Sequence, residues 1–240
     1  MTAGRPAARG AGIPAPRFSC MDHPIDYFIT RLSQTRLDGP AVNPYAAVAT
    51  DPVLEAANRI RRHNLRLYLH TMAAARPWLL LVGEAPGYRG CRLTGVPFTS
   101  EAILVSQGIW PFSAQAGFRK SAERDIVVKE ATATIIWSAL AGWQPPPLLW
   151  NAFPFHAHRD GQPASNRKPN APELRLGAAF LIDLVKLFQP QVVAAVGRSA
   201  AHALDHAGLS DYHQLRHPSH GGKAAFMTGL SKIQTLAKGR

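Results

Sequence analysis

Residues 79–87 of the chain read Leu-Leu-Leu-Val-Gly-Glu-Ala-Pro-Gly. Four consecutive apolar residues cannot alternate between a buried and an exposed face, so this pattern predicts a strand that is covered on both sides, as in a parallel sheet. The glycine and proline that follow predict that the strand ends in a turn. Because ligands of parallel sheets bind outside the carboxyl ends of the strands, Glu84 stands where chemistry is expected.

The rest of the chain alternates apolar strands with amphipathic helices. The patterns predict strands at 78–82, 148–152, 191–196 and 212–215, and helices at 24–37, 52–74, 99–108, 121–140, 172–188, 197–206 and 224–238. This alternation predicts an α/β fold, namely a three-layer α/β/α sandwich with a central four-stranded parallel sheet. The strand ends then meet near Gly83, Asn151, Gly197 and His217, so four separate loops contribute to one site.

Length and charge narrow the class of protein. A chain of 240 residues favours one domain, expected over residues 21–240, after an Ala-, Gly-, Pro- and Arg-rich segment at 1–20 that we expect to be a flexible tail. Lys and Arg outnumber Asp and Glu by 27 to 15, for a formal net charge of +12. This balance favours nucleic acid as the partner, and the alternative is a basic surface that only aids solubility.

The cysteine count and the hydropathy pattern exclude further classes. Cys20 and Cys91 are too few for a disulfide framework, a four-cysteine zinc site or a cysteine-ligated iron–sulfur cluster. No apolar run approaches the length of a membrane span, and the arginines near the N-terminus precede no apolar signal-peptide region. We therefore expect a cytoplasmic protein without cofactor, metal or membrane partner.

Four motifs in a fixed order point to a known family. They are Gly-Glu-Ala-Pro-Gly at 83–87, Gly-Val-Pro-Phe at 95–98, Asn151 at the end of a later strand, and His-Pro-Ser at 217–219. Over roughly residues 78 to 236, this set resembles the uracil-DNA glycosylase superfamily, and most closely its branch with a Gly-Glu-Ala-Pro-Gly first motif. The resemblance implies a monomeric, monofunctional enzyme that hydrolyses the N-glycosidic bond of deoxyuridine in DNA and leaves an abasic site.

The resemblance also implies roles for individual side chains. Glu84 would orient the attacking water and favour the cationic sugar, and His217 would donate a hydrogen bond to the uracil oxygen that gains charge. Phe98 would stack on the flipped base. Asn151 would pair with the edge of uracil, because an amide offers both a donor and an acceptor while cytosine presents the opposite pattern.

Further contacts are expected around these side chains. The loop residues Gly83, Ala85, Pro86 and Gly87 are expected to line the substrate. Ser199, Ser219 and Lys223 are expected to contact the DNA backbone, the first of them at a helix start.

Departures from the family pattern are informative. Many members of this branch carry four cysteines for an iron–sulfur cluster, so the two cysteines here imply a cluster-free member. Tyr-Arg-Gly-Cys-Arg at 88–92 replaces the acidic residues that often follow the first motif. The bulky apolar wedge of some relatives is absent after Ser219, and no Lys-Arg-Arg insertion precedes His217, which favours a simple hydrolase.

Two alternatives to a uracil glycosylase remain open. One is a catalytically weak protein of the same fold that binds abasic sites or DNA, and the other is a glycosylase for another deaminated base.

Two clusters of side chains resemble a functional site but are not assigned one. His156 and His158 are expected on a loop, facing solvent or DNA rather than a metal. The arginines between Arg59 and Arg66 are expected on the solvated face of a helix.

Overall fold

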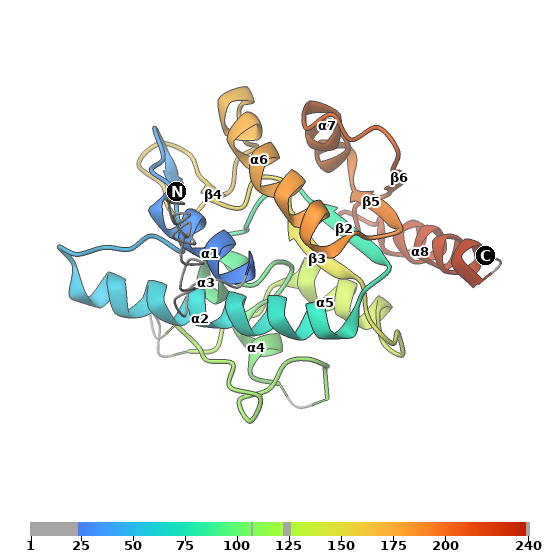
Figure 1. Cartoon of the computed structure of the whole chain (residues 1–240), viewed down its shortest axis with the longest axis horizontal. Coiled ribbons are helices and arrows are strands. Elements are labelled where there is room, and N and C mark those ends of the chain that lie inside the picture. Colours follow the sequence, from blue (N-terminus) through green and yellow to red (C-terminus); the bar gives the residue numbers. More distant parts are fainter. Residues whose placement is uncertain (1–23, 107, 122–125, 239–240) are drawn as a thin grey trace, which may run out of the picture.

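The computed structural model describes residues 24–106, 108–121 and 126–238 (Figure 1). The predicted tail at 1–20, with Cys20, lies outside these residues. In chain order the elements are α1 (Pro24–Gln34), β1 (Ala41–Val42), α2 (Pro52–Ala75), β2 (Leu79–Gly83), α3 (Cys91–Thr94), α4 (Glu101–Leu104), α5 (Ala131–Ala139), β3 (Leu148–Asn151), β4 (His156–Ala157), α6 (Ala171–Phe188), β5 (Val192–Val196), α7 (Arg198–His206), β6 (His213–Leu215) and α8 (Lys223–Lys238).

The centre of the molecule is the predicted four-stranded parallel sheet, with strand order β3-β2-β5-β6. Every residue of β2 and β3 is buried, as the continuous apolar run at 79–82 predicts. The register pairs Gly83 with Asn151 at the ends of β2 and β3. The two motif residues therefore lie side by side although they are far apart in the sequence.

Helices flank the sheet on both faces, which confirms the predicted fold class. The chain moves one way across the sheet from β2 to β3, and the opposite way through α6 and α7 to β5 and β6. Right-handed crossovers then place the β2–β3 connection, with α5, on the face opposite α6 and α7. Figure 1 shows this arrangement, with α6 and α7 together on one side of the strands and α5 on the other.

Caps and close packing fix the helices that support the site. The Asp51 carboxylate accepts hydrogen bonds from the amides of Val53 and Leu54, as the Asp-Pro start of this helix predicts. Helix α6 starts with a capping box between Asn170 and Glu173. A β-carbon at Gly177 would lie only 2.2 Å from the Ala152 carbonyl oxygen, so glycine lets α6 approach the chain directly after β3.

Two predicted helices are much shorter in the structure. The helix predicted at 99–108 is only α4 in the structure, because Val105 caps it with a non-helical backbone conformation. Gly108, with φ +97°, lies outside any right-handed helix. In the prediction at 121–140, residues 126–130 are not helical, and 122–125 lie outside the described residues. The amide of Val128 donates to Glu101 and its carbonyl accepts from Ala102, so this segment packs on the start of α4 instead. Helix α5 begins only at Ala131, where the Glu130 carboxylate caps its first amides.

The sequence patterns did not predict β1, β4 or the short α3. The first two form a small antiparallel pair, Ala41 with Ala157 and Val42 with His156. Each strand has two residues, too few for an alternation to be visible. Among the residues that the structure describes, no helix is both long enough and apolar enough to cross a membrane.

Candidate active site

The predicted site residues gather at one edge of the sheet, where the parallel strands end. Glu84 follows β2 directly, Asn151 ends β3, Ser199 lies in the first turn of α7 after β5, and His217 follows β6 by two residues. The carboxyl ends of parallel strands share one edge of the sheet, so these four side chains come from four strand ends to one place.

Phe98 and Asn151 approach each other closely over Gly83. A β-carbon at this position would lie 2.4 Å from the Phe98 ring atom Cζ and 3.0 Å from the Asn151 Oδ1. Glycine is thus required for the aromatic ring and the amide to approach each other over the end of β2. Asn151 is buried, whereas Phe98 is partly exposed. The structure therefore brings the Phe98 ring and the Asn151 amide next to each other at the end of β2, and their roles toward a base stay predictions.

The backbone at Phe98 adopts an uncommon conformation. Its φ is +54°, in the left-handed region that phenylalanine rarely occupies. The indole Nε1–H of Trp137 donates to the Phe98 carbonyl oxygen at 2.9 Å and holds this conformation. A strained, well-supported aromatic residue is typical of a functional position.

Glu84 is partly buried, and its carboxylate is electrostatically perturbed. Burial raises the pKa of Glu84 above its ordinary value, while the hydrogen bond from Ser199 and the positive charge of Lys168 oppose this rise. Its carbonyl oxygen accepts from the Phe153 amide at 3.0 Å, so the backbone that carries the side chain is anchored to the segment after β3. A partly buried carboxyl group with a raised pKa is a candidate for acid–base chemistry.

His217 is held in one orientation by Ser219. The His217 Nδ1 lies 2.7 Å from the Ser219 hydroxyl and 3.2 Å from the Ser219 backbone amide. Because a backbone N–H can only donate, Nδ1 acts as an acceptor, and we infer that the proton of the neutral ring is on Nε2. Burial lowers the pKa of His217, and Arg216 and His220 lower it further, whereas the Glu130 carboxylate raises it. The ring is therefore neutral at pH 7 and offers an Nε2–H donor.

Gly197 makes room for this ring. It has φ +92°, and a β-carbon there would lie 3.0 Å from the His217 β-carbon. Glycine at the start of α7 thus permits both the positive φ and the close approach of the loop that carries His217.

The loop at 83–87 is braced by several hydrogen bonds. The Gly87 carbonyl accepts from the amides of Gly90 and Arg92, and the Tyr88 amide donates to the Asn166 side chain at 3.0 Å. The Pro86 carbonyl lies 2.8 Å from the Nδ1 of His156. The segment with Asn166 thus supports the first motif directly.

The expectation for the histidine pair was wrong. His156 and His158 lie at 0% and 9% exposure, and His156 belongs to β4 rather than to a solvated loop. The two ring nitrogens of His156 face the carbonyl oxygens of Pro86 and Pro163. This histidine therefore has a structural role behind the loop at 83–87, which the i, i+2 spacing did not reveal.

The expectation for the arginine run needs the same kind of correction. Arg61 is 1% exposed and donates to the Leu93 carbonyl and the Asn58 side chain. The backbone of Arg61 also lies against Gly95, where a β-carbon would meet its carbonyl oxygen at 2.5 Å. Only Arg59 and Arg66 of this run are exposed, so α2 uses one arginine to support the segment before Phe98.

The residues predicted to contact the DNA backbone lie around the same edge of the sheet. Ser219 is partly buried and is held to His217, and Lys223 is exposed at the first residue of α8.

Sequence reasoning missed two residues near the site. Glu130 caps α5 close enough to His217 to affect its pKa, and Cys91 lies close to Asn151. Neither residue belongs to a motif, and only the fold brings them to the site.

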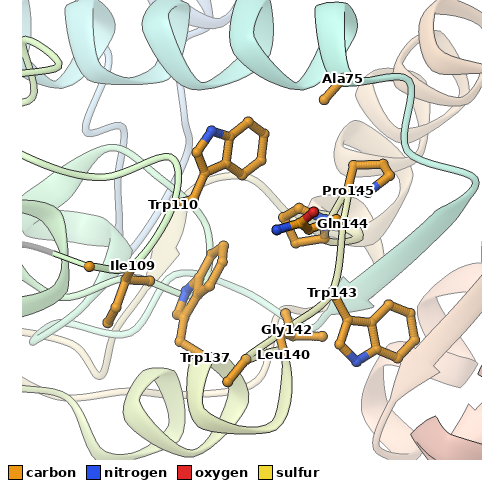
Figure 2. A pocket seen from close by; sticks show the side chains of 12 residues that line it. Ala75, Ile109, Trp110, Trp137, Leu140, Gly142, Trp143, Gln144 and Pro145 are labelled. Atoms are coloured by element: carbon orange, nitrogen blue, oxygen red, sulfur yellow. The ribbon is translucent and has the colours of Figure 1, made fainter.

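A separate hollow lies at the opposite, amino end of the sheet (Figure 2). It has a volume of about 560 Å³ and is lined by Trp110, Trp137, Trp143 and Pro145, with Gln144 as the polar side chain. Pro145 precedes β3, and Ala75, which also lines the hollow, ends α2 shortly before β2. No acid, base or nucleophile lines this hollow, so it does not offer hydrolytic chemistry.

The described residues contain no group of three or more His, Cys, Asp or Glu side chains arranged to hold a metal ion. The site at the carboxyl end of the sheet combines one carboxylate, one imidazole, one amide and one aromatic ring.

The chain thus combines an α/β fold with a carboxylate, an imidazole, an amide and an aromatic ring at the carboxyl edge of its parallel sheet. Residues 70–234 match the uracil DNA glycosylase superfamily, and the chain belongs to this superfamily, whose members are DNA glycosylases. No curated protein sequence matches the chain. Among solved structures, the chain is similar to wild-type SMUG2 from Pedobacter heparinus, with a TM-score of 0.59 and 13% identity over 90% of this chain and 98% of that one. At this identity, the likeness shows that the two proteins share a fold.

Proposed function

We propose that this DNA glycosylase removes uracil from DNA by hydrolysing the N-glycosidic bond of a flipped-out deoxyuridine. The convergence of Phe98 and Asn151 over Gly83, with Glu84 and His217 at the same sheet edge, is the observation that carries this proposal. A base within a duplex cannot be reached, so the nucleotide must leave the stack and move to this edge of the sheet.

In the proposed complex, the Phe98 ring stacks on the uracil face and Asn151 pairs with its edge. The amide oxygen accepts from uracil N3–H and the amide nitrogen donates to uracil O4. Cytosine presents an acceptor at N3 and a donor at N4, so the same amide orientation leaves two buried groups without partners. Such an unpaired group costs roughly 1–3 kcal/mol.

In the proposed reaction, the bond between C1′ and N1 breaks, and its electron pair passes to the uracil ring. The sugar becomes an oxocarbenium-like cation, which the Glu84 carboxylate favours electrostatically. His217 donates its Nε2–H to the uracil oxygen that gains negative charge. Glu84 orients a water molecule, whose oxygen then bonds to C1′ and whose proton is released, leaving an abasic site.

The proposed DNA path runs over the edge formed by α7 and α8. Ser199, Ser219 and Lys223 supply hydroxyl and ammonium groups for phosphates. The formal net charge of +12 adds a long-range attraction for DNA.

We also propose that the enzyme is a cluster-free, monofunctional member of the branch with the Gly-Glu-Ala-Pro-Gly motif. The chain has two cysteines, whereas the cysteine-ligated cluster takes four. Cys91 is buried and in contact with Tyr45 and Asn151, so this cysteine already has a different environment.

The test is cleavage of a labelled oligonucleotide with a single uracil, in the presence of EDTA, followed by alkali to break any abasic site. Product from both single-stranded and paired substrates supports metal-independent uracil excision. No product, together with tight binding to abasic DNA, contradicts the proposal and supports a binding protein of the same fold. No uracil product, but excision of hypoxanthine or xanthine, assigns the site to another deaminated base.

A further inference from the structure

We propose that Trp137 is a positioning residue for base recognition, because its indole N–H holds Phe98 in the backbone conformation that directs the aromatic ring over Gly83. This inference rests on the proposed function, in which the Phe98 ring stacks on uracil. Trp137 lies in α5, outside the sequence motifs, and it contacts the Phe98 backbone.

The backbone conformation at Phe98 decides where its ring points. Its φ of +54° lies in the left-handed region, where a β-carbon crowds the carbonyl oxygen that follows it. The direction of the Cα–Cβ bond depends on this conformation. In the structure the ring atom Cζ reaches to 2.4 Å from the position of a β-carbon on Gly83. A return of Phe98 to a negative φ would turn the ring away from Gly83, so the stacking surface depends on contacts that keep φ positive.

The hydrogen bond from Trp137 supplies such a contact, and its direction is unambiguous. An indole N–H can only donate and a carbonyl oxygen can only accept, so the 2.9 Å contact from Trp137 Nε1 to the Phe98 oxygen needs no choice of tautomer. This bond fixes the peptide plane that follows Phe98. The next residue, Thr99, donates its hydroxyl to the Val96 carbonyl oxygen at 2.6 Å. The loop is therefore closed on itself by Thr99 and tied to α5 by Trp137.

The surroundings of Trp137 fix its ring. The side chain is 5% exposed and meets Phe112 edge to face, with ring centroids 4.9 Å apart. Phe112 in turn stacks on the buried Tyr68. The Glu130 carboxylate caps the first amides of α5, the helix that carries Trp137. The indole thus has a defined position in the core, against which the Phe98 carbonyl is held.

The hollow at the amino end of the sheet offers a matched control. Trp137 and Trp143 both line it (Figure 2). Trp143 stacks on Trp78, with ring centroids 5.9 Å apart and an interplanar angle of 17°. A change at Trp143 therefore removes aromatic packing from the same hollow and leaves the hydrogen bond to the Phe98 carbonyl in place.

The test compares Trp137→Phe with Trp143→Phe in single-turnover uracil excision. Both variants keep an aromatic ring, and only Trp137→Phe removes the donor to Phe98. We expect Trp137→Phe to slow excision about tenfold, as for one lost hydrogen bond, and Trp143→Phe to stay within about twofold of the wild type. In a Phe98→Ala background, Trp137→Phe should cause no further loss, because the tryptophan acts through the phenylalanine. No loss in Trp137→Phe, the same loss in Trp143→Phe, or an undiminished loss in the Phe98→Ala background would overturn the inference.

A closer match to the wild type carries benzothienylalanine at position 137, a tryptophan analogue in which sulfur replaces the indole N–H. It retains the size and shape of the bicyclic ring, so the test stands even if Trp137→Phe does not fold. Excision should again fall about tenfold. Excision at the wild-type rate would overturn the role of the N–H.

A last readout needs no activity. The three-bond NMR couplings of the Phe98 backbone, which report its φ, should change in Trp137→Phe and match the wild type in Trp143→Phe. Unchanged couplings in Trp137→Phe overturn the role of the indole even if uracil excision holds. If the wild type excises no uracil, the proposed function fails, and these couplings still decide whether Trp137 fixes the Phe98 backbone.

Discussion

The two ends of the sheet differ sharply in chemistry, although the same strands run between them. At the carboxyl end, Glu84, Asn151 and His217 meet, and burial displaces the pKa values of the carboxyl and imidazole groups. At the amino end, Trp110 and Trp143 line a hollow of about 560 Å³ without a titratable group (Figure 2). Trp137 also lines this hollow and joins it to the other end through its hydrogen bond to the Phe98 carbonyl.

This difference teaches that the direction of the strands, rather than the size of a cavity, locates the reactive groups. The loops that leave the carboxyl ends carry polar side chains to one edge. The segments that enter the strands, such as the prolines before β3, pack aromatic surface instead.

The largest effect is expected from Glu84→Gln, which keeps the size of the side chain and removes its charge. Excision should fall by roughly 10²–10⁴-fold, the usual contribution of a positioned acid or base. The matched change at the other end is Trp110→Ala, at a side chain that is 49% exposed, and it should change the rate by less than about twofold. Single-turnover rates on a uracil oligonucleotide measure both, and equal losses would contradict the contrast between the two ends.

His217→Gln should lower excision by roughly 10²–10³-fold, as expected for the loss of one donor to a developing negative charge. Ser219→Ala should cost less, because the Ser219 backbone amide still holds the Nδ1 of His217. The same single-turnover assay measures both variants. A His217→Gln enzyme as fast as the wild type would remove the imidazole from the proposed mechanism.

Gly83→Ala should slow excision by roughly 5- to 150-fold, which corresponds to the energy of one base–aromatic stack. Its new methyl group would lie 2.4 Å from the Phe98 ring and displace it. Gly87→Ala, in the same loop, should be milder, since its β-carbon would meet nothing closer than 3.9 Å. Titration with uracil-containing DNA under non-cleaving conditions would show the weakened binding, and equal affinities for the two variants would contradict the proposed role of the Phe98 ring over Gly83.

The smallest effect concerns pH. Excision by the wild type should decline as pH falls through the pKa of Glu84, which lies above the ordinary value of 4.5. Protonation of His217 adds a donor and does not remove one, so it should not produce this decline. The low residual rate of Glu84→Gln should therefore stay level over the same range. A parallel decline in both enzymes would assign the titration to another group.

Much of the fold could be predicted because the signals are local and repeated. The continuous apolar run at 79–82 predicts a covered parallel strand, and the Asp51 cap predicts where α2 begins. The gathering of Glu84, Asn151 and His217 follows from strand direction alone. The structure confirms these placements, and the roles of the three side chains stay predictions.

The rest depends on contacts between distant segments. The helix predicted at 121–140 is wrong over 126–130 because Val128 pairs with the start of α4, a partner that no local pattern reveals. The burial of His156 and Arg61 follows from carbonyl oxygens supplied by Pro86 and Leu93. Residues of this kind look solvated in a sequence, because their partners are backbone atoms of other loops.

The raised pKa of Glu84 also has a consequence for the thermodynamics of folding. A carboxyl group that holds its proton more tightly in the folded chain than in the unfolded chain favours the folded state at low pH. This contribution is lost as pH rises from 4.5 through the folded-state pKa, and at neutral pH the buried charge opposes folding. The protein thus gives up some stability to keep a carboxylate at the strand end, and Glu84→Gln should melt at a higher temperature than the active enzyme.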